Sequence, residues 1–170
     1  IHRLAARLSQ VTLWRDGATI TRAGCGTLAP DIGFSAGARA GLAWSERTEL
    51  LVSLRGARPL PDAAWIRAVR EAADAAGLTI RTVVQVREDE DRAREIARLL
   101  GGTFDAWGDT DSVTQEEVLR DRYDAAQIVI SDLMHVLVLA ALSGAIPVEL
   151  VPNPTAKIAD AFAAVGLQGV

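Results

Sequence analysis

Short apolar segments alternate with amphipathic segments along most of the chain. Several apolar segments are rich in β-branched or aliphatic residues, and we expect them to be strands at residues 49–54, 79–86, 103–107, 128–130 and 146–151. The intervening segments have helical spacing with cap and stop residues, and we expect helices over 62–77, 87–100, 111–126 and 153–165. A further helix is expected to carry His135 in its first turn and to run to 143–144.

This alternation predicts an α/β fold, namely a Rossmann-like, five-stranded parallel sheet with helices on both faces. Right-handed crossovers give the strand order 3-2-1-4-5. In that order the first strand lies beside the fourth, and the chain reverses direction between them. Ligands of such sheets bind in the crevice at this reversal, outside the carboxyl ends of the strands.

Residues 1–48 fit the alternation less well. They contain the end of a helix at 3–8, a strand at 11–14, a short helix or turn at 19–24, an apolar turn at 30–34 and a loop at 36–47. We expect residues 1–48 to be the tail of a preceding α/β unit plus a linker, and residues 49–170 to form a Rossmann-like C-terminal domain. Arg15 and Asp16 are expected to form an internal ion pair or to anchor a turn.

Composition narrows the classes of function. Hydrophobic residues make up 49 %, charged residues 24 %, and the formal net charge is −4, which disfavours a nucleic-acid partner. No apolar run is long enough for a transmembrane segment. Two histidines and one cysteine are too few and too scattered for a metal site, and we expect no metal or cofactor. The chain begins with Ile1, so we expect it to be part of a longer protein.

Candidate chemistry lies where the first and fourth strands end. His135 is in the first turn of the helix that follows the fourth strand, and Arg55 ends the first strand, so we expect them to face each other across the crevice. A histidine there suits proton transfer, and an arginine suits a phosphate or carboxylate. Ser131 and Asp132 are expected to cap the helix, with an anion contact as a second role. The alternatives are a packed or capping histidine and a surface arginine, as expected for Arg58.

Six segments, in this order, resemble the C-terminal half of the polysaccharide pyruvyl transferase family. They are residues 11–19 (VTLWRDGAT), 30–34 (PDIGF), 51–56 (LVSLRG), 128–135 (IVISDLMH), 144–148 (GAIPV), and Lys157 before the last helix. Each segment is short, and their shared order carries the resemblance.

The resemblance implies a glycosyltransferase-B-like architecture in which most of an N-terminal domain is missing from this chain. It also implies a bacterial enzyme of cell-surface polysaccharide biosynthesis that transfers a pyruvyl group from phosphoenolpyruvate to a glycan or a lipid-linked sugar acceptor. On this view Arg55, Ser131, Asp132 and Lys157 bind the donor, and His135 and Arg55 are catalytic. The implied location is the cytoplasm, with peripheral association with the inner membrane as an alternative.

One residue departs from the family pattern. Leu133 stands where the family has an arginine two residues before the histidine, and leucine cannot bind an anion. Two other functions therefore remain open: a glycosyltransferase of the B type that uses a nucleotide sugar, and a non-catalytic relative that binds a glycan or a partner.

Overall fold

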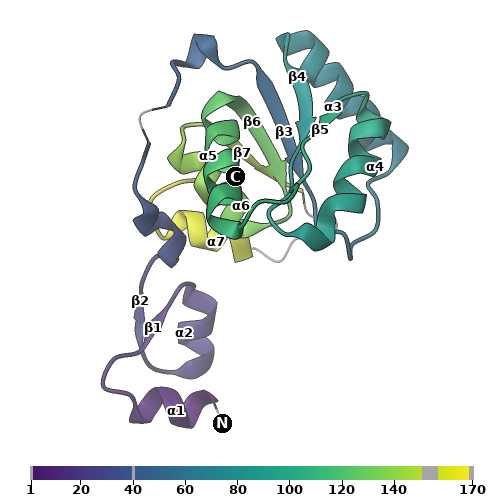
Figure 1. Cartoon of the computed structure of the whole chain (residues 1–170). Coiled ribbons are helices and arrows are strands. Elements are labelled where there is room, and N and C mark those ends of the chain that lie inside the picture. Colours follow the sequence, from purple (N-terminus) through teal and green to yellow (C-terminus); the bar gives the residue numbers. More distant parts are fainter. Residues whose placement is uncertain (1, 40, 151–156, 169–170) are drawn as a thin grey trace. The chain divides into compact units, whose positions relative to one another are not determined.

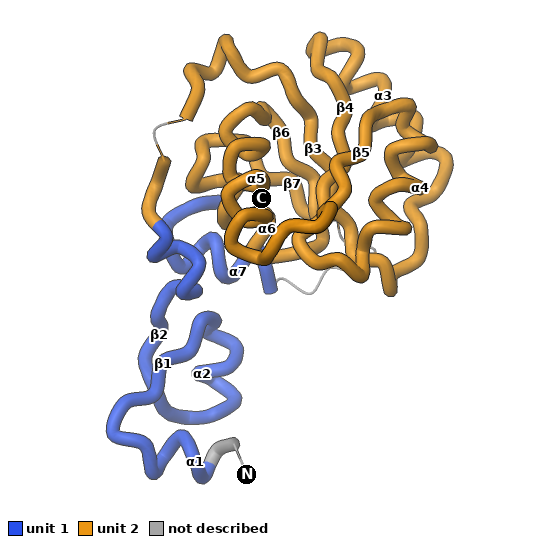
Figure 2. The backbone as a smooth tube through the Cα atoms, in the orientation of Figure 1, with its two compact units in different colours: residues 1–36, 151–170 blue, residues 37–150 orange. Residues whose placement is uncertain are grey.

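The chain forms two compact units in the computed structural model, which describes residues 2–39, 41–150 and 157–168. One unit comprises residues 1–36 and 151–170, and the other comprises residues 37–150, coloured blue and orange in Figure 2. The expected division lay between residues 48 and 49. Residues 37–48 instead belong to the unit that contains the sheet, and helix α7 (Lys157–Ala163) belongs to the unit of the N-terminal residues.

The unit of residues 37–150 is built on a parallel sheet with the order β5-β4-β3-β6-β7, which confirms the predicted Rossmann-like arrangement. Its strands are β3 (Glu49–Ser53), β4 (Thr79–Thr82), β5 (Thr103–Phe104), β6 (Ala126–Ser131) and β7 (Ile146–Glu149). Strand β3 is the central strand and is buried along its whole length. It pairs with β6, and the strand order reverses direction between these two strands.

Helices cover both faces of this sheet, as Figure 1 shows. They are α3 (Ala63–Ala76), α4 (Glu90–Leu100), α5 (Ser112–Ala125) and α6 (Met134–Leu142). Alternate residues of β3 point to opposite faces: Leu50 and Val52 pack with α3 and α4, whereas Leu51 packs with α5 and α6. The two faces therefore have separate apolar cores, and both β3 and β6 contribute side chains to each of them.

The helix boundaries follow local signals that the sequence displays. The Asp62 side chain accepts a hydrogen bond from the Trp65 amide at the start of α3, and Gly77 ends the helix at a φ of 66°. Asp111 caps α5 in the same way through the Thr114 amide. These carboxylates satisfy amide groups that the first turn leaves without a partner, which explains why the predicted starts agree with the structure.

Strands β4 and β5 end several residues before their predicted ends. Strand β4 ends at Thr82 rather than Val86, and β5 ends at Phe104 rather than Trp107. Only Arg81 and Thr82 have partners on β5, so the ladder stops there, although Val83 and Val84, which follow β4, remain buried. The apolar and β-branched side chains of Val83, Val84 and Val86 made this segment resemble a continuing strand.

Arg47 is a buried cation in the segment that precedes β3, which was expected to be a plain loop. Its side chain donates hydrogen bonds to the carbonyl oxygens of Leu42 at 3.1 Å, Ala126 at 3.0 Å and Ser143 at 2.5 Å. The residue is only 6 % exposed. The guanidinium thus joins this segment to the beginning of β6 and the end of α6.

The unit of residues 1–36 and 151–170 contains α1 (His2–Leu8), β1 (Leu13–Trp14), α2 (Gly17–Ala23), β2 (Thr27–Leu28) and the 3₁₀ turn η1 (Ile32–Ala36), besides α7. Strand β2, which pairs in parallel with β1, was not predicted. The predicted start of the last helix at 153–155 lies outside the described residues.

Arg15 and Asp16 each anchor this unit, but with different partners. Asp16 caps α2 by accepting from the Thr19 amide at 2.6 Å, and the hydrogen bonds from Thr19 lower the pKa of its carboxyl. Arg15 pairs with Asp31 at 3.1 Å.

Within the described residues, no helix combines the length and the apolar character needed to cross a bilayer.

Candidate active site at the carboxyl ends of β3, β6 and β7

Three polar residues align across the carboxyl ends of neighbouring strands. Ser53 at the end of β3 lies opposite Ser131 at the end of β6, and Ser131 lies opposite Glu149 at the end of β7. The Ser131 hydroxyl donates to the Ser53 carbonyl oxygen at 2.6 Å. This row marks the edge of the sheet at which ligands of such folds bind.

Asp132 ties the turn after β6 to the loop after β3. One carboxylate oxygen accepts from the Arg55 amide at 2.9 Å, and the other lies 3.1 Å from Nε of Arg58. The Asp132 side chain is 3 % exposed, while that of Arg58 is 41 % exposed. A carboxylate buried this deeply is stable only when its oxygens are paired, so Asp132 serves as an internal anchor.

The loop after β3 is also held from the side of α4. The Asp89 carboxylate accepts from the Gly56 amide at 2.7 Å, and Arg92 donates to the Gly56 carbonyl oxygen at 3.0 Å. A Cβ atom at residue 56 would lie 3.1 Å from that Asp89 oxygen, which favours glycine here.

Two carboxylates therefore occupy consecutive backbone amides of this loop, those of Arg55 and Gly56. Many phosphate sites use such amides to bind the anion. Here an anion has to be bound by side chains instead. The exposed side chain of Arg55 and the partly exposed side chain of Arg58 are the cations that this loop offers.

The turn that carries His135 differs from the expected helix cap. The residue before α6 is Leu133, whose side chain makes no capping bond, so the prediction that Ser131 and Asp132 cap this helix is wrong. Ser131 instead accepts from the Leu133 amide at 3.0 Å while its own proton goes to Ser53, and Asp132 is directed to the loop after β3. Both side chains are used to build the turn, and their donor-binding role stays a prediction.

His135 is the second residue of α6 and is exposed. Arg55 and His135 follow the ends of adjacent strands, β3 and β6, as predicted. Leu133 is partly buried and packs against the apolar core on the α5 and α6 face. An arginine at residue 133 would have to leave this core to reach a ligand.

Lys157 begins α7 in the other unit and is exposed. Its donor-binding role remains a prediction.

Sequence reasoning missed two residues of this edge. Arg58 was expected to be a surface residue, and Glu149 was part of an apolar strand segment with no assigned role. Burial raises the pKa of the Glu149 carboxyl, and the positive charge of Arg58 opposes that change. The strand order would have placed both residues at this edge, because Arg58 follows β3 and Glu149 ends β7, and both strands are neighbours of β6.

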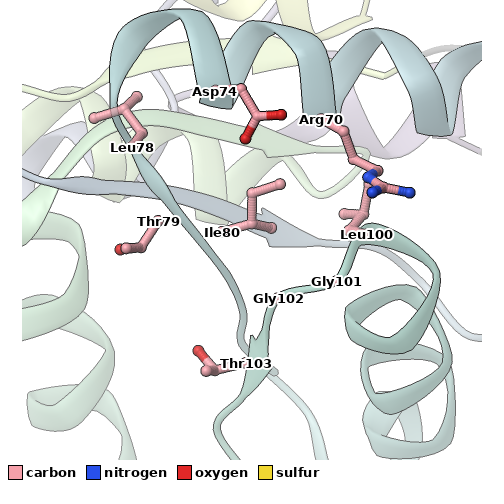
Figure 3. Close-up of a pocket in the computed structure, with 9 residues that line it drawn as sticks. All are labelled: Arg70, Asp74, Leu78, Thr79, Ile80, Leu100, Gly101, Gly102 and Thr103. Carbon is pink, nitrogen blue, oxygen red and sulfur yellow. The ribbon is translucent and has the colours of Figure 1, made fainter.

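A pocket of about 370 Å³ lies at the opposite edge of the sheet, at the start of β4 and β5, as Figure 3 shows. Its charged residues are Arg70 and Asp74, both exposed on the last turns of α3. Exposed side chains of opposite charge one helical turn apart are ordinary surface features. The carboxyl edge, with its buried carboxylates, is the better candidate for a site.

In the part of the chain that the structure describes, no group of three or more His, Cys, Asp or Glu side chains is arranged to hold a metal ion. Comparisons of the chain with protein-family models, curated proteins and solved structures found no match. The chemistry of the site is therefore inferred from its own residues.

Replacing Asp132 tests whether the site depends on this anchor. We expect Asp132→Ala to lower the free energy of unfolding by about 2 kcal/mol, because the Arg55 amide and Arg58 lose a charged acceptor. Asp132→Asn keeps one oxygen for the amide, so a smaller loss is expected. Urea unfolding of the full chain measures both changes. Equal stability of the Ala variant and the wild type would show that the anchor is dispensable.

Proposed function

We propose that this chain carries the donor-binding and proton-transferring site of a pyruvyl transferase-like enzyme. In this proposal the donor is phosphoenolpyruvate and the acceptor is a hydroxyl group of a glycan or lipid-linked sugar. The observation that carries the proposal is the Asp132 anchor, since it holds the loop of Arg55 and Arg58 against the turn that leads to His135.

The cations of this loop suit an anionic donor. A guanidinium binds a phosphate or a carboxylate through two parallel hydrogen bonds, and phosphoenolpyruvate contains both groups. Arg58 is already oriented by Asp132, while Arg55 is fixed at its backbone and has an exposed side chain. Arg58 thus offers a second cation at a site where Leu133 cannot.

The transfer also requires movement of protons. Formation of a pyruvate ketal adds a proton to the methylene carbon of the donor and removes protons from the attacking hydroxyl groups. An exposed histidine in the first turn of α6 is suited to give such a proton, because an imidazole side chain commonly serves as a general acid.

Donor binding and phosphate release test the proposal. The full chain is expected to bind phosphoenolpyruvate in calorimetry and to release phosphate when a glycosyl acceptor is added. Arg55→Ala is expected to weaken donor binding about tenfold or more, because a charged hydrogen bond is worth about 1.5–3 kcal/mol.

The matched control is Arg67→Ala, which removes an exposed arginine of α3 and is expected to leave donor binding unchanged. Absence of both donor binding and phosphate release in the wild type would overturn the proposal. Tight binding of a uridine or guanosine diphosphate in place of phosphoenolpyruvate would favour a nucleotide-sugar glycosyltransferase.

A non-catalytic relative is the second candidate, and the packing of Leu133 favours it. This residue contributes an apolar side chain to the core where the resembling family has a cation. The two candidates differ in one measurement: the non-catalytic relative binds a glycan and releases no phosphate from phosphoenolpyruvate.

A further inference from the structure

Glu149 is a third carboxyl group at the carboxyl edge, besides Asp132 and Asp89. Asp132 is engaged by the Arg55 amide and Arg58, and Asp89 is engaged by the Gly56 amide. Both of those residues are 7 % exposed. Glu149 is partly exposed and ends a strand of the sheet, so its position is set by strand pairing with Ser131.

The surroundings of Glu149 suit a carboxyl group that exchanges protons. It is the charged residue among those lining an apolar pocket of about 300 Å³, beside Val148 and Leu150. Low polarity disfavours the carboxylate, and burial accordingly raises the pKa above its usual value of 4.5. A carboxyl group with a raised pKa is a stronger base once it is ionised.

Charged and titratable groups at this edge of the sheet come from three elements, and Arg58 is the one that acts on Glu149. Arg58, from the loop after β3, attracts its negative charge. Asp132, from the turn after β6, shares Arg58 and thereby reduces that attraction. His135 belongs to α6, which packs against β7. Glu149 is the last residue of β7, and His135 is in the first turn of α6, which follows β6. Both residues therefore belong to the carboxyl edge of the sheet.

We propose that Glu149 is a catalytic residue that accepts the proton of the acceptor hydroxyl, an inference that rests on the proposed function. The hydroxyl oxygen bonds to C2 of the donor while its proton passes to Glu149. His135 gives a proton to C3, and the methylene becomes a methyl group. The bond from C2 to the phosphate oxygen then breaks, and a second hydroxyl closes the ketal as its proton leaves with the phosphate. Exchange with solvent restores both side chains.

The test compares Glu149→Gln with the wild type over a range of pH. Glu149 has to be ionised to accept a proton, so wild-type kcat is expected to fall as pH drops through its raised pKa. The variant is expected to lose about 100-fold or more in kcat and to lose this acid limb, with little change in donor affinity.

Glu117→Gln, at an exposed position of α5, is the matched control and is expected to keep both the rate and the profile. If the wild type is active and Glu149→Gln keeps its rate and acid limb, the role of Glu149 is wrong and the proposed function stands. If the wild type releases no phosphate, both are wrong.

Discussion

Arg47→Ala is expected to lower the free energy of unfolding by about 3 kcal/mol or more, measured by urea or thermal unfolding of the full chain. The guanidinium donates to carbonyl oxygens from the segment before β3, from β6 and from the end of α6. Truncation removes the donor from these carbonyl oxygens, of which those of Ala126 and Ser143 are in buried contacts, and opens a cavity. Both effects favour the unfolded state.

Two further variants keep this prediction testable if Arg47→Ala does not fold. Arg47→Lys retains the charge but not the planar fork, so it is expected to recover only part of the stability. Arg98→Ala removes an exposed arginine of α4 and is expected to change stability by no more than about 0.5 kcal/mol. A stability loss for Arg98→Ala as large as that for Arg47→Ala would contradict the assigned role of Arg47.

The sheet and its strand order were predictable because their signals are local or follow from chain chirality. Strand β3 is a largely apolar run. Asp62 and Gly77 cap the two ends of α3 through contacts with residues only a few positions away in sequence. Once the elements were known, right-handed crossovers left β5-β4-β3-β6-β7 as the default order.

The partners of side chains were not predictable in the same way. Ser131 and Asp132 precede a helix, which is the ordinary setting of a cap, yet they bond to Ser53 and to the loop after β3. Those contacts join residues more than seventy positions apart in sequence. No local pattern distinguishes a serine that caps its own helix from one that bonds to a neighbouring strand.

The same limit explains Arg47 and Arg58. Each is an arginine in a loop rich in small or polar residues, a context typical of exposed side chains. The structure makes Arg47 a buried donor to several carbonyl groups and makes Arg58 the partner of Asp132. The roles of these residues depend on which strands the fold places side by side.

His135→Ala is expected to reduce kcat/KM for phosphate release by about 10²- to 10⁴-fold, the range for loss of a general acid. The proton that converts the methylene carbon of the donor into a methyl group would no longer have a positioned source. Because His135 is exposed on α6 and Arg55 is held by Asp132, donor affinity and unfolding stability are expected to change little.

The comparison with Arg55→Ala separates proton transfer from binding. Loss of an arginine that holds the donor raises KM or the dissociation constant, whereas loss of the proton donor lowers kcat at saturating donor. Equal effects on donor binding in the two variants would mean that His135 contributes to the anion site. An unchanged kcat in His135→Ala, with the wild type active, would assign the proton to solvent or to another group.

Since the Asp132 anchor serves Arg55 and Arg58 directly, Asp132→Ala should reproduce the binding defect of Arg55→Ala.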